Sequence, residues 1–290
     1  MPESRSADFA ARRATFRKLH ESGCFLIPNP WDVGSARYLQ GLGFKALATT
    51  SAGFAFSLGR PDSASAVPLD VTLAHFAEIA AACDLPVNAD FQAGYADTPE
   101  GVGENVRRCV ETGVSGLSIE DSTGDPRRPL YDVDEAVRRL KAARAAIDAS
   151  GTGVLLTARA ECHLVGTPDP LSDSIRRLRA YAEAGADVLY APGLTNADDI
   201  ATVVRSVDRP LNVVMGLQGV QLSQAALSAL GVTRISVGSA LSRAALGAFL
   251  RAATEMKEHG TFTFAEEAVS YREISDRFSP TQNASKFLSR

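Results

Sequence analysis

Eight short apolar runs divide the chain, and each run ends at a polar or charged residue. The runs are Cys24–Pro28, Ala46–Thr50, Pro86–Asp90, Gly116–Asp121, Gly153–Arg159, Asp187–Pro192, Leu211–Met215 and Arg234–Gly238. Segments with the apolar spacing of amphipathic helices follow the runs at intervals of roughly 20–40 residues. Because short buried strands that alternate with helices are typical of parallel α/β folds, eight such units predict a (β/α)8 barrel of the TIM type.

The sequence also indicates where several helices begin. Asp32, Asp70, Thr98 and Asp134 each precede an apolar periodic segment and are expected N-caps, because their side-chain oxygens can accept hydrogen bonds from first-turn amides. Two connections are longer than usual for such a fold. They are 51–69 after the second run and 122–131 after the fourth. We expect both to act as lids or substrate clamps, since loops at this end of a barrel carry function.

The pattern of predicted strands and helices indicates a single domain. Residues 8–22 predict an amphipathic helix that covers the lower mouth of the barrel. We therefore interpret residues 1–260 as a single barrel with its N-terminal helix, and residues 261–290 as a C-terminal extension. The last predicted helix, Ala240–His259, and the aromatic residues after it are apolar enough that we expect them to pack on a neighbouring subunit, in a homodimer or homotetramer.

Composition excludes several classes of function. The formal net charge is −4 over 290 residues, and no basic stretch carries interleaved aromatics, so nucleic acid and anionic membrane surfaces are not expected partners. The first 22 residues hold no continuous apolar segment of a secretory signal, and no apolar run reaches the ~18 residues that cross a bilayer. We expect a cytoplasmic protein. The four cysteines are scattered, which argues against a zinc site or a disulfide framework.

The available side chains limit the chemistry further. None of the lysines ends a predicted strand, so a Schiff-base or pyridoxal mechanism is not expected. Of the four histidines only His163 lies near a strand end, which argues against a histidine-bound zinc. Any metal would have to be held by oxygen ligands. Oxygen ligands favour Mg²⁺, with Mn²⁺ as an alternative.

Three strand ends carry carboxylates, of which Asp32 is read as an N-cap and two remain candidates for chemistry. Asp90 ends the third run, and Glu120-Asp121 ends the fourth. If the third strand continued to Gln92, then Asn88, Asp90 and Gln92 would share one face. Taken singly, each carboxylate could simply cap a turn or accept amides of the next loop. Because strand ends of a barrel meet at one mouth, the paired carboxylates would repel unless a cation or proton lay between them. The pair therefore favours a metal site.

The fifth run ends in Arg159, which must project into the same mouth. Its planar fork suits a substrate carboxylate or phosphonate, and a structural ion pair with Glu120 or Glu161 is an equally good interpretation. The segment Thr49–Ala52 offers hydroxyls and amides that could bind an oxyanion, although it could equally be an ordinary loop. Asn212, in the seventh run, is a further candidate for substrate binding.

Several strand-end motifs together resemble the isocitrate lyase/phosphoenolpyruvate mutase superfamily, from about the first strand to the last helix. They are Trp31-Asp32-x-x-Ser35-Ala36, Thr49-Thr50-Ser51 with Leu58-Gly59-x-Pro61-Asp62, Asp90-x-x-x-Gly94-Tyr95, Ile119-Glu120-Asp121 and Ala158-Arg159. The resemblance implies a (β/α)8 barrel whose last helix is exchanged between subunits, an Mg²⁺ cofactor, and substrates that are small anionic 2-oxo acids or their enolates.

The resemblance also implies roles for residues. Thr49, Thr50, Ser51 and Ala52 would hold the carboxylate and enolate oxygens of the substrate. Asp90 and Glu120 would act at or around the metal together with Asp62, which would also be catalytic. Arg159 would bind the acidic group of the substrate and take part in catalysis.

The chain departs from the lyases of that superfamily in the loop after the fourth strand. Those lyases carry Lys-Lys-Cys-Gly-His there, whereas this chain has Ser-Thr-Gly-Asp-Pro-Arg-Arg at 122–128. Asn88 and Gln92 stand where related sequences often have acidic residues. Decarboxylation suits the missing Cys and His, because loss of CO₂ needs no base to begin. The leading hypothesis is a carbon–carbon lyase or decarboxylase for a small 2-oxo dicarboxylate; a phosphomutase and a non-catalytic 2-oxo acid binding protein are the alternatives.

Overall fold

The computed structural model describes residues 3–63 and 66–279. Eight parallel strands form one sheet in the order β1-β8-β7-β6-β5-β4-β3-β2. Their bounds are β1 Phe25–Ile27, β2 Leu47–Ala48, β3 Val87–Asp90, β4 Gly116–Glu120, β5 Leu155–Arg159, β6 Val188–Tyr190, β7 Leu211–Val214 and β8 Arg234–Ser236. The Ala48 amide donates to the Pro28 carbonyl at 3.1 Å beside β1. The predicted (β/α)8 barrel is thereby confirmed, and each strand lies inside its predicted run.

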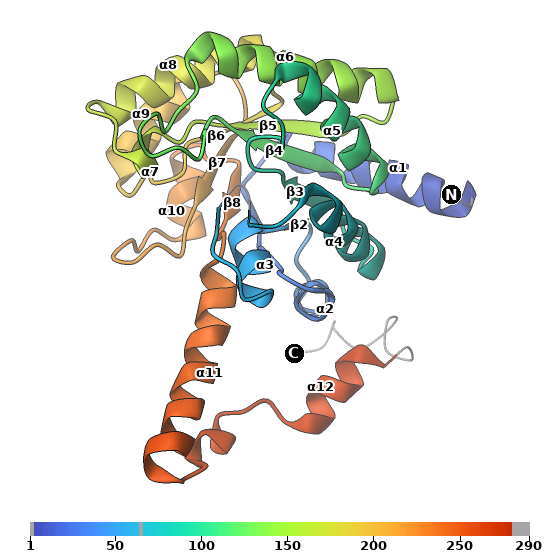
Figure 1. Cartoon of the computed structure of the whole chain (residues 1–290), viewed down its shortest axis with the longest axis vertical. Helices are drawn as coiled ribbons and strands as arrows, with labels where there is room; N and C mark the ends of the chain where they lie inside the picture. Colours follow the sequence, from blue (N-terminus) through green and yellow to red (C-terminus); the bar gives the residue numbers. More distant parts are fainter. Residues whose placement is uncertain (1–2, 64–65, 280–290) are drawn as a thin grey trace.

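Helices alternate with the strands around the barrel (Figure 1). Their bounds are α1 Glu3–Leu19, α2 Val33–Gly41, α3 Ser51–Ser57, α4 Leu69–Ala82, α5 Pro99–Glu111, α6 Val133–Ser150, α7 Cys162–Val165, α8 Pro170–Glu183, α9 Ala197–Ser206, α10 Gln224–Ala229, α11 Ala240–His259 and α12 Tyr271–Phe278, with a short 3-10 helix, η1, at Thr263–Glu266. Within the described residues, none of these helices combines the length and apolarity that a membrane span requires.

Two of the four predicted N-caps are confirmed. Asp32 accepts from the Ser35 amide at 2.6 Å, and Thr98 accepts from the Gly101 amide. The predictions for Asp70 and Asp134 are wrong, because α4 and α6 begin earlier and place both carboxylates inside the first turn. Acidic side chains are favoured at the cap and in the first turn alike, so the sequence signal does not distinguish the two positions.

The lower mouth of the barrel is covered by α1, as predicted, although this helix ends at Leu19. Phe16 is completely buried and packs in one apolar cluster with Phe25, Ile27 and Leu155 from the strands. Burial of this aromatic ring closes the end of the barrel opposite to the strand ends that carry the polar residues. Access to the interior is therefore from the carboxyl end of the strands.

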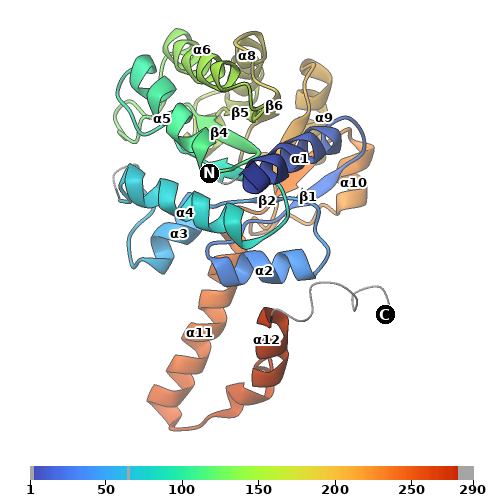
Figure 2. The ribbon, with the colours of Figure 1, turned by 90° about the vertical axis from the view of Figure 1, so that its right-hand side faces the viewer.

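The last long helix, α11, leaves the barrel and projects away from it, as Figures 1 and 2 both show. Only Ser242 of this helix is buried, while Phe249 is 64% and Leu250 is 56% exposed. The chain then returns through α12, whose Phe278 ring lies 5.5 Å from the ring of Tyr38 in α2. An apolar helix with this exposure has no partner surface within the described part of its own chain.

Candidate active site

A cleft of about 450 Å³ opens at the carboxyl ends of the strands. Its walls include Ser51 after β2, Asp90 from β3, Glu120 from β4, Arg159 from β5 and Tyr190 from β6. A larger groove of about 650 Å³ lies between α1, α5 and α6, but it contains none of the candidate site residues. The catalytic end of a barrel is the end where its strands finish, so the smaller cleft is the candidate active site.

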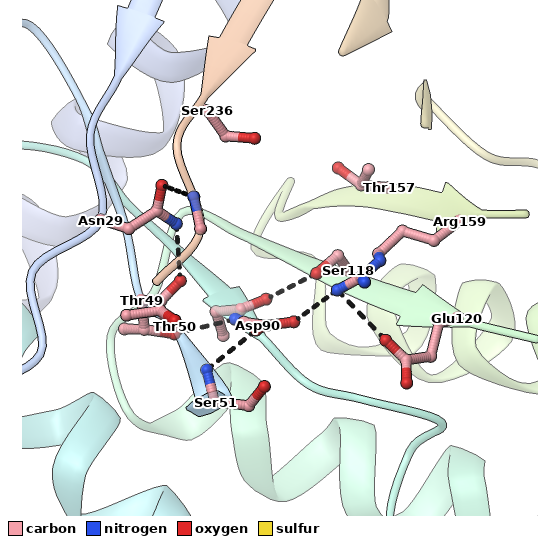
Figure 3. Close-up of polar contacts among 12 residues, drawn as sticks. Asn29, Thr49, Thr50, Ser51, Asp90, Ser118, Glu120, Thr157, Arg159 and Ser236 are labelled. Atoms are coloured by element: carbon pink, nitrogen blue, oxygen red, sulfur yellow. Dashed lines mark hydrogen bonds and ion pairs between the residues drawn. The ribbon is translucent and has the colours of Figure 1, made fainter. Parts of the chain in front are cut away.

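Arg159 lines the cleft, and Figure 3 shows its guanidinium joined to both Asp90 and Glu120. Its Nη1 atom lies 2.9 Å from Asp90 Oδ1 and 3.1 Å from Glu120 Oε2, and its Nη2 atom lies 2.9 Å from Glu161 Oε1. These contacts arise because β3, β4 and β5 are neighbours in the sheet, with Asp90 opposite Ser118 and Glu120 in register with Arg159. The ion-pair interpretation of Arg159 is confirmed; its contact with a substrate stays a prediction.

The floor carries more negative than positive charge. Asp62, Asp90, Glu120 and Glu161 all interact with the one guanidinium of Arg159. Burial raises the pKa of Glu120 to about 8. The neighbouring carboxylates raise this pKa further, and the positive charge of Arg159 opposes the rise. Burial and then Asp90 likewise raise the pKa of Asp62. The cluster therefore holds a proton near neutral pH unless a further cation relieves the repulsion.

The donor set of the cleft fits Mg²⁺. The floor offers carboxylate oxygens in excess of the positive charge, and hard oxygen ligands are the ones that Mg²⁺ prefers. Within the residues that the structure describes, no three His, Cys, Asp or Glu side chains converge as a ready-made metal site. This agrees with Mg²⁺ chemistry, in which one or two carboxylates are supplemented by water and substrate. Asp90 and Glu120 are the residues that would hold the ion, with Asp62 beside them.

The predicted oxyanion segment is only partly available to a substrate. The Ser51 amide donates to Asp90 Oδ2 at 2.9 Å, and the Thr50 hydroxyl accepts from the Gly53 amide. Thr50, Ser51 and Ala52 line the cleft, and the Ala52 amide has no acceptor among the described residues. Thr49 does not line the cleft, because it is buried and its hydroxyl accepts from the Asp90 amide at 2.8 Å. Thr49 thus orients Asp90.

Asn212, predicted to bind substrate, and Asn88, expected to share a face with Asp90, both lie inside the barrel and not in the cleft. Asn212 Oδ1 accepts from Arg234 Nε at 2.8 Å, and its Nδ2 donates to Ser236. Asn88 is buried and does not share the cleft with Asp90 and Gln92. The expected common face of the three residues is broken because β3 ends at Asp90 and Gln92 has a left-handed φ of 44°.

The structure adds Arg243 to the candidate site, and it gives the contacts of Tyr190 and Asn29, which the sequence places at strand ends. Arg243, in the first turn of α11, is the second arginine of the cleft lining. The Tyr190 ring centroid lies 5.0 Å from Arg159 Cζ, in cation–π geometry. Asn29 Oδ1 accepts from the amides of Val237 and Gly238 at 2.9 Å, which fixes the segment that leads into α11. Tyr190 and Asn29 end predicted strands, whereas Arg243 lies on a helix and gave no strand-end signal.

Three comparisons with known proteins agree on the ancestry of the chain. A solved structure of a provisionally assigned lyase/mutase from Burkholderia cenocepacia is 54% identical, with a TM-score of 0.91, covering 94% of this chain and 98% of the other. Oxaloacetate decarboxylase of a Bradyrhizobium species is 30% identical, covering 70% of each chain. A structure of oxaloacetate acetylhydrolase with the product oxalate is 26% identical, with a TM-score of 0.82, covering 93% of this chain and 94% of the other.

The family model described as phosphoenolpyruvate phosphomutase matches residues 16–257, which span the whole barrel and almost all of α11. The relatives include enzymes named as lyases, decarboxylases and phosphomutases. The match and the shared fold confirm the resemblance found in the strand-end motifs. The chain belongs to the phosphoenolpyruvate phosphomutase family, within the isocitrate lyase/phosphoenolpyruvate mutase superfamily.

Proposed function

We propose that the protein is an Mg²⁺-dependent enzyme that decarboxylates or cleaves a small 2-oxo dicarboxylate, of the oxaloacetate type, through an enolate. One observation carries the proposal: the four carboxylates around Arg159 form a cation-binding floor, and Arg243 and the Ala52 amide stand in the walls of the same cleft. An oxo acid that chelates a metal requires a site for the divalent ion and, in the same cleft, hydrogen-bond donors for its own anionic groups.

Different residues of the cleft would bind the metal and the substrate. Asp90 and Glu120 would hold the ion, and Asp62 would act beside it. When bound, Mg²⁺ polarises the 2-oxo group and stabilises the charge that develops as the carbon–carbon bond breaks. The Ala52 amide and the Ser51 hydroxyl donate to substrate oxygens. Arg159 holds the carboxylates in place and contacts the near carboxylate, and Arg243 attracts the distal one.

Decarboxylation is the reaction that the cleft supports best. Among the described residues, the lining contains no lysine, histidine or cysteine, so a base or nucleophile of these three types does not face the substrate. Loss of CO₂ leaves its electron pair on the substrate and needs no base to start. The similarity to an oxaloacetate decarboxylase supports the same choice.

Two alternatives rest on specific observations. The family model takes its description from a phosphomutase, which supports migration of a phosphoryl group as a second candidate reaction. Gln92 lines the cleft beside Asp90 without adding a negative charge, which supports a protein that binds 2-oxo acids and does not turn them over. All three candidates bind a small anionic 2-oxo acid, and they differ in its second acidic group and in what happens after binding.

We also propose that α11 completes its packing on a second copy of the chain, in a homodimer or homotetramer. The support is the exposed apolar face of α11, whose only buried residue is Ser242. Exchange of this helix between subunits would cover Leu246, Phe249 and Leu250 with apolar surface of the neighbour.

The experiment incubates the purified protein and Mg²⁺ with oxaloacetate, with other C4 and C5 2-oxo dicarboxylates, and with phosphonopyruvate, and identifies the products by NMR. We expect a 2-oxo or enol product shortened by CO₂ from at least one dicarboxylate. Phosphoenolpyruvate formed from phosphonopyruvate would favour the phosphomutase. Binding of these acids without any product, seen as protection against heat, would favour the non-catalytic protein.

A further inference from the structure

The interior of the barrel just below the active-site cleft is polar. A second cavity of about 50 Å³ lies there and shares Asp90, Arg159 and Tyr190 with the cleft above it. The rest of its polar wall consists of hydroxyl, amide and guanidinium groups of Asn29, Thr49, Asn88, Ser118, Asn212, Arg234 and Ser236. Branched apolar side chains are the usual filling of a barrel of this type, so this lining requires a physical reason.

The main feature of the cavity is Arg234, which is 3% exposed. Its Nε donates to Asn212 Oδ1 at 2.8 Å, its Nη2 donates to Thr157 Oγ1 at 3.1 Å, and its Nη1 lies 3.4 Å from His20 Nε2. Burial lowers the pKa of Arg234 to about 10, which still leaves the guanidinium protonated at neutral pH. These hydrogen bonds use only part of its five N–H groups, and no carboxylate of the described chain forms an ion pair with it.

His20 cannot supply the missing negative charge. Its Nδ1 lies 2.8 Å from the Phe16 carbonyl and must donate to it, so the Nε2 lone pair faces Arg234. Burial and then the charge of Arg234 lower the pKa of His20 to about 3, and the ring is therefore neutral. The lower side of the guanidinium meets only neutral groups.

The upper side of the cavity does not neutralise Arg234 either. Asp90 is the one carboxylate in the lining, and it is already paired with Arg159 at 2.9 Å and with the Ser51 amide at 2.9 Å. Arg234 is thus buried without a carboxylate partner of its own. Buried charges in proteins are paired, because an unpaired one loses its hydration without compensation.

A further buried group lacks a partner in the same cavity. Asn88 is 3% exposed, and its Oδ1 has no hydrogen-bond donor among the described residues. Figure 3 shows Ser118 and Ser236, two residues of the cavity lining, on strands of the barrel. The volume of about 50 Å³ exceeds the 10–15 Å³ that a single water requires.

We propose that this cavity binds a small monovalent inorganic anion of halide size, together with a water molecule. Arg234 provides the counter-charge, and the water donates to Asn88 Oδ1. The volume admits an ion of this size and excludes a dicarboxylate, so the site is separate from the substrate position above it. The inference does not depend on the reaction proposed for the cleft.

The direct test uses crystals of the wild-type protein grown or soaked with bromide in place of chloride. Anomalous diffraction at the bromine absorption edge locates each bound bromide. We expect a strong peak inside the barrel, in contact with the Arg234 guanidinium. Peaks confined to the protein surface, with none in the interior, would overturn the proposal. This measurement requires no variant and no activity.

A solution measurement tests the role of the guanidinium. Thermal unfolding is compared in sodium bromide and in sodium gluconate, an anion too large for the cavity, at equal ionic strength. We expect the Tm to be higher in bromide by about 5 °C, as for a site occupied well above its Kd. Arg234→Met should lose this shift, and Arg205→Met, which changes an exposed arginine of α9, should keep it.

The outcomes are separable. A bromide-dependent shift that persists in Arg234→Met would place the anion elsewhere and contradict the proposal. If Arg234→Met fails to fold, the wild-type anomalous map decides alone. Decarboxylase activity does not enter either readout, so failure of the proposed function would leave this result standing, and the converse also holds.

Discussion

The guanidinium of Arg159 lies 2.9 Å from Asp90 Oδ1 and so joins the ends of β5 and β3 across the end of β4, which lies between them. The same nitrogen contacts Glu120 of β4 at 3.1 Å. One arginine therefore sets the spacing of the two carboxylates assigned to the metal. A change at either residue should alter both metal binding and substrate binding, which makes this pair the most informative place for mutagenesis.

We expect Asp90→Asn to abolish Mg²⁺-dependent activity while the fold stays intact. Asparagine keeps an acceptor for the Ser51 amide but removes one negative charge from the floor, so the metal is held less tightly. A loss of at least ~100-fold in kcat/KM is expected. Steady-state assays over a range of Mg²⁺ concentrations measure it, with circular dichroism as the check on folding. Asp173→Asn, in the first turn of α8, is the matched control and should behave as wild type. If Asp90→Asn keeps both its activity and its metal affinity, Asp90 does not bind the metal.

We expect Arg159→Lys to raise the KM of the substrate sharply, by ~10-fold or more, since a point charge replaces a bidentate fork. The lysine ammonium also cannot reach Asp90, Glu120 and Glu161 together, as the guanidinium does. Steady-state kinetics with each accepted 2-oxo acid provide the test. A KM that is unchanged for every acid would leave Arg159 as a structural ion pair alone.

The pH dependence of stability should report on Glu120. Its pKa is raised from 4.5 to about 8 in the folded chain, so the folded state keeps a proton that the unfolded state releases. The free energy of unfolding should then fall as the pH rises between these two values, by at most ~1.4 kcal/mol per pH unit from this group. Glu120→Gln cannot ionise and should lose less stability over the same range.

Denaturant unfolding in EDTA at several pH values measures this difference. Wild type and Glu120→Gln are compared directly, and Glu104→Gln, an exposed surface change, serves as the control. Parallel stability curves for wild type and Glu120→Gln would contradict the raised pKa. Added Mg²⁺ should stabilise the wild type more at the alkaline end, because the ion displaces the proton.

The segment from Ala240 to Tyr271 should pack on another subunit, so we expect at least a dimer at micromolar concentration. Truncation after Ser239 should give an insoluble or unstable chain. Phe249→Glu should weaken the assembly, because it places a charge on an exposed apolar face of α11, and Val71→Glu on α4 is the control. Analytical ultracentrifugation measures each. A full-length protein that sediments as a monomer would contradict the proposed exchange of α11.

The positions of the strands could be predicted from the sequence because parallel barrel strands are buried on both faces and form nearly continuous apolar runs. The strand-end residues Asp90, Glu120 and Arg159 could be predicted for the same reason, since the ends of neighbouring strands converge. The direction in which a side chain points within a run could not. Asn212 faces the interior because it is in register with Arg234, and this register is a property of the assembled sheet.

Other features depend on contacts between distant segments. Thr49 was expected to hold substrate, but its hydroxyl is occupied by the Asp90 amide across the β2–β3 pair. Arg243 enters the cleft only because α11 starts directly at its rim. Arg234 is unremarkable in the sequence, since its lack of a carboxylate partner becomes visible only when the whole interior is assembled.

The most direct test of the central claim is the decarboxylation of oxaloacetate by the wild-type protein, followed as pyruvate formation and corrected for the spontaneous and Mg²⁺-catalysed background. The account predicts pyruvate at a rate proportional to protein concentration in Mg²⁺, loss of that rate in excess EDTA, and its absence in Asp90→Asn under both conditions. Pyruvate formation that is equal in EDTA, or no formation above background while oxaloacetate raises the Tm, would contradict an Mg²⁺-dependent decarboxylase.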